Sequence, residues 1–132
     1  MPVVTTTPPE RTGADPRPEL AVRDDAVVLV GSRCHRCGHP MATSPPRCPV
    51  CGHEVMAPAD FGPAATVFSS TVLRIPVPGR PPPFTLAYVD VDDGPRILAH
   101  VHGPDEALVP GCRVRLAGWN GHGDPVVTRT TP

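Results

Sequence analysis

The feature that most constrains this sequence is a duplicated Cys-x-x-Cys-Gly-His motif, found at residues 34–39 and again at residues 48–53. The two-residue gap allows both sulfurs of a pair to face one point. The glycine after each second cysteine permits the positive φ with which backbone N–H groups turn toward the thiolates. Four thiolates form a closed tetrahedral shell that leaves no position for water or substrate. The motif therefore predicts a structural zinc site with the ligands Cys34, Cys37, Cys48 and Cys51.

Disulfides and iron are the alternatives to zinc for the four cysteines. Two disulfides are disfavoured, because the paired spacing is that of a metal site and no secretory leader precedes it. Iron is held by the same four-thiolate geometry in rubredoxins, and the spacing does not separate the two metals, so zinc is expected with iron as the alternative. The neighbouring His35, His39 and His53 are expected to be solvated loop residues, since four cysteines already fill the shell.

Charge and length limit the classes of function. The 132 residues carry a formal charge of −1, and all twelve basic side chains are arginine, so general binding to nucleic acid is disfavoured. Neither an apolar run of membrane-spanning length nor a charged-then-apolar leader is present, which predicts a cytoplasmic protein without membrane contact. The length suits one modest core, for which a metal is a sensible supplement.

Short apolar or alternating runs separated by turn residues dominate the chain after residue 58, and no segment keeps a helical period. Candidate strands lie at residues 66–74, 84–91, 96–102, 112–117 and 126–129. Five such strands predict a Greek-key barrel of the OB type. Shorter strands at 26–31 and 54–57 would flank the cysteine motifs. We therefore predict an all-β chain: a proline-rich disordered tail at 1–25, a rubredoxin-like zinc ribbon at 26–58 and an OB-fold at 59–132.

The order of these pieces resembles one bacterial and archaeal family, which joins a rubredoxin-like zinc ribbon to an OB-fold and was long catalogued as a domain of unknown function. The resemblance covers residues 26–119. After the ribbon it rests on the segments GPAATVFSSTV at 62–72, PFTLAYV at 83–89, DGPRIL at 93–98 and VPGCRV at 109–114. The N-terminal helices with which many members dock their partners have no counterpart here.

The resemblance implies a non-catalytic partner of acyl-CoA enzymes, which include thiolases and thiolase-like lipid-transfer proteins, aldolases that cleave steroid side chains, and hydratases of the hot-dog fold. The implied task is to hold acyl-CoA or to pass it between active sites. For the phosphates of coenzyme A, the candidate ligands are Arg74, Arg80 and Arg96, expected to gather near one end of the barrel. For the partner enzyme, the candidate contacts are Pro78 and Pro82 in the stiff loop 74–83, together with Trp119.

Three classes of function account for different parts of this sequence. An accessory subunit in a hetero-oligomer, acting in lipid, steroid or polyketide-type metabolism, is favoured because no nucleophile–base pair, open metal position or phosphate-binding glycine loop is found. His100 and His102, which alternate on one strand, are interpreted as solvated side chains without chemistry. A nucleic-acid-binding module would need basic stripes and paired aromatics that the sequence lacks. A rubredoxin-like electron carrier would use iron at the thiolates and leave the barrel without a role.

Overall fold

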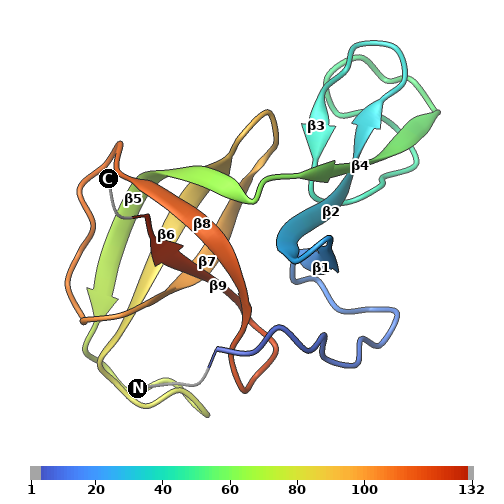
Figure 1. Ribbon diagram of the computed structural model, residues 1–132. Helices are drawn as coiled ribbons and strands as arrows, with labels where there is room; N and C mark the ends of the chain where they lie inside the picture. Colours follow the sequence, from blue (N-terminus) through green and yellow to red (C-terminus); the bar gives the residue numbers. More distant parts are fainter. Residues whose placement is uncertain (1–3, 131–132) are drawn as a thin grey trace.

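The computed structural model describes residues 4–130, and within this range the chain forms nine strands and no helix (Figure 1). The strands are β1 Glu19–Arg23, β2 Ala26–Cys34, β3 Pro40–Met41, β4 Met56–Phe61, β5 Ala64–Leu73, β6 Phe84–Val91, β7 Arg96–His102, β8 Arg113–Trp119 and β9 Pro125–Arg129. The predicted all-β class is confirmed. The described residues include no helix that is long and apolar enough to cross a membrane.

A four-stranded sheet built around β2 forms the first half of the molecule. The first half of β2 pairs with β1, and the rest pairs with β3 on one side and β4 on the other, all antiparallel. β4 begins and ends later than the expected 54–57 and includes Pro58, which lies opposite Ser32. Proline is tolerated there because β4 is an edge strand in the described sheet. The missing N–H of Pro58 removes no hydrogen bond to a second neighbouring strand.

The remaining strands close into a barrel with the order β5-β6-β7-β9-β8, in which β8 returns to β5. The β7–β9 pair is parallel and the others are antiparallel, which is the Greek-key order of an OB-fold. All five predicted barrel strands are confirmed: β6 and β7 have the predicted bounds, and the ends of the other three differ by at most two residues. Register shifts after Val67 on β5 and after Leu116 on β8 bend these strands, which allows so small a sheet to close.

One apolar core joins the barrel to the base of the first sheet. Alternation along β6 and β7 places Ala87, Val89 and Ala99 inside the barrel, each at most 1% exposed. Leu29 from β2 and Phe61 from β4 belong to the same buried cluster. A second, smaller cluster of Cys34, Met41 and Cys48 surrounds the sulfurs. The metal region is therefore a separate small core attached to a larger one.

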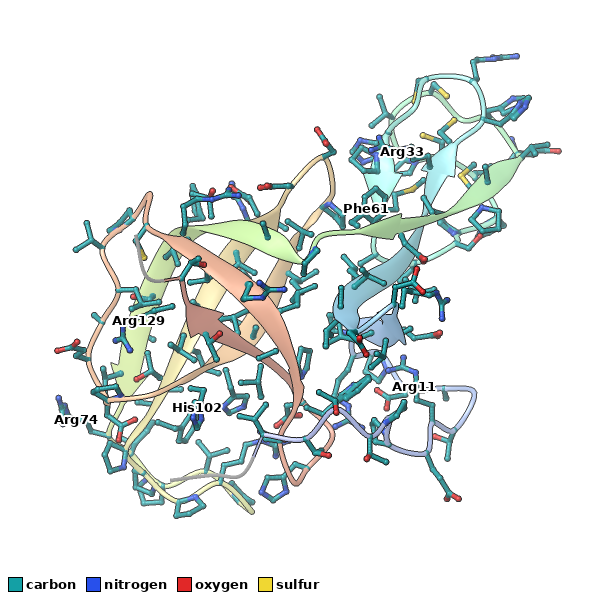
Figure 2. All side chains as sticks on the ribbon, viewed as in Figure 1. Arg11, Arg33, Phe61, Arg74, His102 and Arg129 are labelled. Carbon is teal, nitrogen blue, oxygen red and sulfur yellow. The ribbon has the colours of Figure 1, made fainter. Side chains whose placement is uncertain are left out.

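The junction between ribbon and barrel is fixed by Arg33 and Phe61 (Figure 2). The Arg33 guanidinium lies 5.0 Å from the Phe61 ring centroid, and its Nη2 donates to the carbonyl of Asp93 at 2.6 Å. Asp93 belongs to the turn between β6 and β7, where a Cβ on Gly94 would lie 2.8 Å from Phe61 Cγ. Only glycine therefore permits the Phe61 ring to pack against this turn.

The N-terminal segment differs from the disordered tail expected for residues 1–25, of which the first three lie outside the described range. Residues 19–23 form β1, and Leu20 enters the core at 4% exposure. Farther back, Thr5 and Trp119 exchange two backbone hydrogen bonds of 2.9 Å each. The polar composition of this segment does not predict its ordered structure, because the residues that bind its backbone lie on strands that are distant in the sequence. We call residues 4–18 the N-terminal arm.

Candidate metal centre and barrel face

The four cysteines of the duplicated motif converge at the far end of the ribbon. All four Sγ atoms lie within 4.8 Å of one another, with Cys34 to Cys51 at 3.5 Å and Cys37 to Cys48 at 3.6 Å. These separations exclude disulfides, whose S–S bond is about 2.05 Å. They are close to the ~3.8 Å between ligands of a tetrahedral ion with metal–sulfur bonds of about 2.3 Å. The arrangement is that of a four-thiolate metal site.

Each half of the site is the same local structure. The carbonyls of Cys34 and Cys48 accept hydrogen bonds of 2.9 Å from Gly38 and Gly52, whose φ values are +78° and +79°. The turn brings backbone N–H groups to the sulfurs, so that Arg36 N lies 3.4 Å from Cys34 Sγ and Val50 N lies 3.4 Å from Cys48 Sγ. The glycines thus perform the role that the motif predicted, since a positive φ is strained for other residues.

The same N–H groups favour thiolate at the buried sulfurs. Burial alone would raise the pKa of Cys34, but hydrogen bonds from the backbone of Cys37 and Arg36 outweigh it and lower that pKa to about 6. A thiolate is the form that binds metal. The rings of His35 and His53 stack 6.2 Å apart and do not join the group of candidate metal ligands among the described residues.

The three candidate arginines do not gather at one end of the barrel, so that prediction is wrong. Arg96 pairs with Asp90 at 2.6 Å and lies 3.5 Å from the Phe68 ring centroid. The register pairs Asp90 with Arg96 at one end of β6 and Leu73 with Phe84 at the other. Arg74 follows Leu73 directly and is exposed (Figure 2). Strand register, which the sequence does not reveal, therefore separates Arg96 from Arg74.

Arg80 belongs instead to a cluster centred on Asp124. The Asp124 carboxylate is 10% exposed and accepts two hydrogen bonds of 2.9 Å from Arg80, in a fork-to-fork arrangement. It also accepts from Arg17 at 3.2 Å, and His100 Nε2 lies 3.2 Å from it. We call these four residues the Asp124 cluster. It joins the N-terminal arm, β7, the β8–β9 loop and the loop of residues 75–83 between β5 and β6, which we call the proline loop.

This cluster was not predicted from the sequence, and His100 is not the solvated side chain that was expected. Its side chain is 18% exposed, and its pKa is lowered, mainly by burial and against the attraction of Asp124. The pKa of Asp124 is also lowered: burial would raise it, but the hydrogen bonds from Arg80, Asn120 and Arg17 prevail. No local signal marked these residues, because Asp124 is 44 positions from Arg80 and 107 from Arg17. The local sequence Gly121-His122-Gly123-Asp124 is typical of a simple turn.

The candidate partner-binding residues differ in their surroundings. Pro78 and Pro82 are exposed in the loop between β5 and β6, as expected for a contact surface. Trp119 is only 2% exposed, so it is not the surface anchor that was predicted. Its side chain belongs to the core, and the N-terminal arm pairs with its backbone. A glycine-rich neighbourhood was mistaken for an exposed one.

Two adjoining hollows lie beside the proline loop. The first, of about 380 Å³, is lined mostly by apolar side chains that include Leu73, Leu86 and Leu98. The second, of about 620 Å³, lies between Pro83, His102 and the loop that carries His122. Arg80, Phe84 and His100 line both hollows. The proline loop, the outer side of β6–β7 and the β8–β9 loop therefore form one recessed surface, which is where OB-folds bind their ligands.

A four-cysteine ribbon attached to a five-stranded OB barrel defines the class of protein, and comparison with known proteins gives the family. Residues 59–119 match the family model "ChsH2, C-terminal OB-fold domain". A "DUF35 domain-containing scaffold protein" of Pyrococcus furiosus is 32% identical over 91 residues, which cover 67% of this chain and 66% of the relative. The chain thus spans just under two thirds of that protein. Our chain belongs to the DUF35 family.

A solved structure supports the same assignment over more of the fold. A chain of the "Ltp2-ChsH2(DUF35) aldolase" superposes with a TM-score of 0.64 and 26% sequence identity. The match covers 79% of this chain and 86% of that one. The predicted resemblance is therefore confirmed.

Proposed function

We propose that this protein is a non-catalytic accessory subunit that docks to an aldolase or thiolase-like acyl-CoA enzyme. The observation that carries the proposal is the likeness to the DUF35 chain of the Ltp2-ChsH2 aldolase, which covers most of both chains. The scaffold name of the Pyrococcus furiosus relative agrees with a binding role. Such a subunit would act by binding the enzyme in a fixed orientation and not by catalysing a reaction itself.

The chemistry of the two polar centres supports a structural role for each. Four thiolates complete a tetrahedral shell, so a zinc ion held there would stabilise the ribbon without an open position for substrate. In the Asp124 cluster the carboxylate is already shared by Arg17, Arg80 and His100. His100 is largely buried and lies against the Asp124 carboxylate, so its role is to hold the β8–β9 loop and not to contact an external substrate.

We further propose that acyl-CoA is held jointly by this chain and its partner. The phosphates of coenzyme A require free cations. Arg80 and Arg96 are each engaged with a carboxylate, at 2.8 Å and 2.6 Å. Arg74 beside the proline loop is then the candidate of the original three that this proposal retains. Titration calorimetry of an acyl-CoA into the complex should show weaker binding for Arg74→Ala than for wild type.

The direct test mixes the purified chain with the aldolase or thiolase-like enzyme encoded nearest to it. Size-exclusion chromatography with light scattering should show one hetero-oligomer with a fixed ratio of subunits. The isolated chain should leave acyl-CoA unchanged. Separate elution of the two proteins at micromolar concentration, or turnover of acyl-CoA by this chain alone, would reject the accessory role.

A further inference from the structure

The outer side of strands β5, β6 and β7 carries an apolar surface. Phe68, Tyr88 and Leu98 are 51%, 48% and 42% exposed, and the register places Tyr88 directly opposite Leu98. Two residues farther along the same face, Leu86 lies opposite His100. The ring centroids of Phe84 and His100 are 5.5 Å apart. We call these residues the β5–β7 face. It leads without interruption into the 380 Å³ hollow under the proline loop.

The charges around this face are already paired with one another. Arg96 binds Asp90 and lies over Phe68, while Arg80 at the other end binds Asp124. A nucleic acid strand would find aromatic rings here but few uncommitted cations for its phosphates, which normally dominate the affinity. The barrel is also closed, so this face offers no free strand edge to an extended peptide. An uncharged apolar protein surface is the complementary occupant.

The size of the face indicates the kind of interface. Large side chains present about 200 Å² each, so the three exposed fractions leave about 300 Å² of apolar surface. A stable homodimer typically buries more than about 1,000 Å² on each subunit, with a larger apolar share. A face of about 300 Å² fits the apolar centre of a standard interface, which buries about 800 Å² on each partner and has a polar rim. The paired Asp90–Arg96 and Asp124–Arg80 groups supply such a rim.

We propose that the β5–β7 face is the surface on which the partner enzyme docks, with an aliphatic or aromatic side chain of the enzyme inserted into the hollow between Phe84 and Leu98. This inference rests on the accessory role proposed above and adds the site of contact to it. The hollow is lined by the half-buried Leu73 and Leu86 and, at its margin, by the exposed Leu98, and a pocket of this type can anchor a dominant interface residue.

The test compares single variants in a binding titration with the same partner enzyme. Leu98→Glu places a charge in the centre of the face and should weaken binding by about thirtyfold or more. Leu98→Met keeps the apolar area and should bind as wild type does. Val22→Glu is the matched control, because Val22 is a strand residue of similar exposure, 38%, on the edge of the ribbon. Metal content and thermal unfolding of each variant report whether it folds.

The outcomes separate the docking site from the accessory role. Equal affinities for wild type and Leu98→Glu would overturn the site and leave the accessory role intact, and so would equal weakening by Val22→Glu. Absence of binding by the wild type would reject both. A wild-type homodimer that Leu98→Glu dissolves would replace the enzyme by a second copy of this chain. If the wild type bound a single-stranded oligonucleotide and Leu98→Glu abolished that binding, the proposal of a protein partner at this face would be overturned.

Discussion

The pair Arg80–Asp124 should be worth about 2 kcal/mol of folding free energy, measured as the coupling in a double-mutant cycle. A hydrogen bond to a charged group contributes about 1.5–3 kcal/mol, whereas exposed ion pairs contribute about 0.2–1 kcal/mol. Here the fork is bidentate and Asp124 is 10% exposed, but Arg80 is 32% exposed. Solvent therefore screens one partner, and the expected coupling lies toward the low end of the charged range.

The assay is urea unfolding of wild type, Arg80→Ala, Asp124→Ala and the double variant at saturating zinc and 0.15 M salt. Trp119 is the one tryptophan of the chain and is 2% exposed in the barrel, so its fluorescence reports barrel unfolding. Asp124→Ala should lose more stability than the coupling itself, because it also deprives Arg17 and His100 of their acceptor. The coupling isolates the pairwise interaction between Arg80 and Asp124.

The exposed pair Arg113–Asp92 provides the control cycle. It is also bidentate, with bonds of 2.8 Å and 2.7 Å, but its side chains are 49% and 45% exposed. Its coupling should stay below about 1 kcal/mol. Equal couplings in the two cycles would refute the reasoning that burial of Asp124 makes the difference. A coupling near zero for Arg80–Asp124 would refute the cluster as a source of stability.

Three further predictions test other parts of the molecule. Cys48→Ser should lose the metal, measured by plasma mass spectrometry, and disorder the ribbon while barrel amides keep their hydrogen-exchange protection. The pKa of His100 is lowered from 6.5 in the folded state, so the unfolded state binds the proton first as the pH falls. The free energy of unfolding should therefore decline below pH 6.5. Urea titrations at several pH values should show a shallower decline for His100→Gln than for wild type. Gly94→Ala should cost about 1–3 kcal/mol in thermal unfolding, because its Cβ would lie 2.8 Å from Phe61, whereas Gly13→Ala, with nothing within 4 Å, should be neutral.

The parts of this structure that the sequence predicted are those set by local patterns. The four sulfurs follow from two spacings and two glycines, and the barrel strands follow from alternation such as that along β6 and β7. The parts it did not predict depend on register and on distant pairs. Arg96 and Arg74 were separated by strand register, and Asp124 meets Arg17 across 107 positions. Trp119 was misjudged because the arm that covers its backbone carries no periodic signal.

The N-terminal arm has a mechanical consequence. The chain is bonded to the barrel at Thr5 and Arg17, continues into the ribbon as β1 and returns to the barrel through β4 and β5 (Figure 1). The ribbon is thus tethered to the barrel at two places, and rotation of one against the other would twist a closed loop of chain. This double attachment fixes the angle between ribbon and barrel in the free chain, so docking to the proposed partner would cost little conformational entropy.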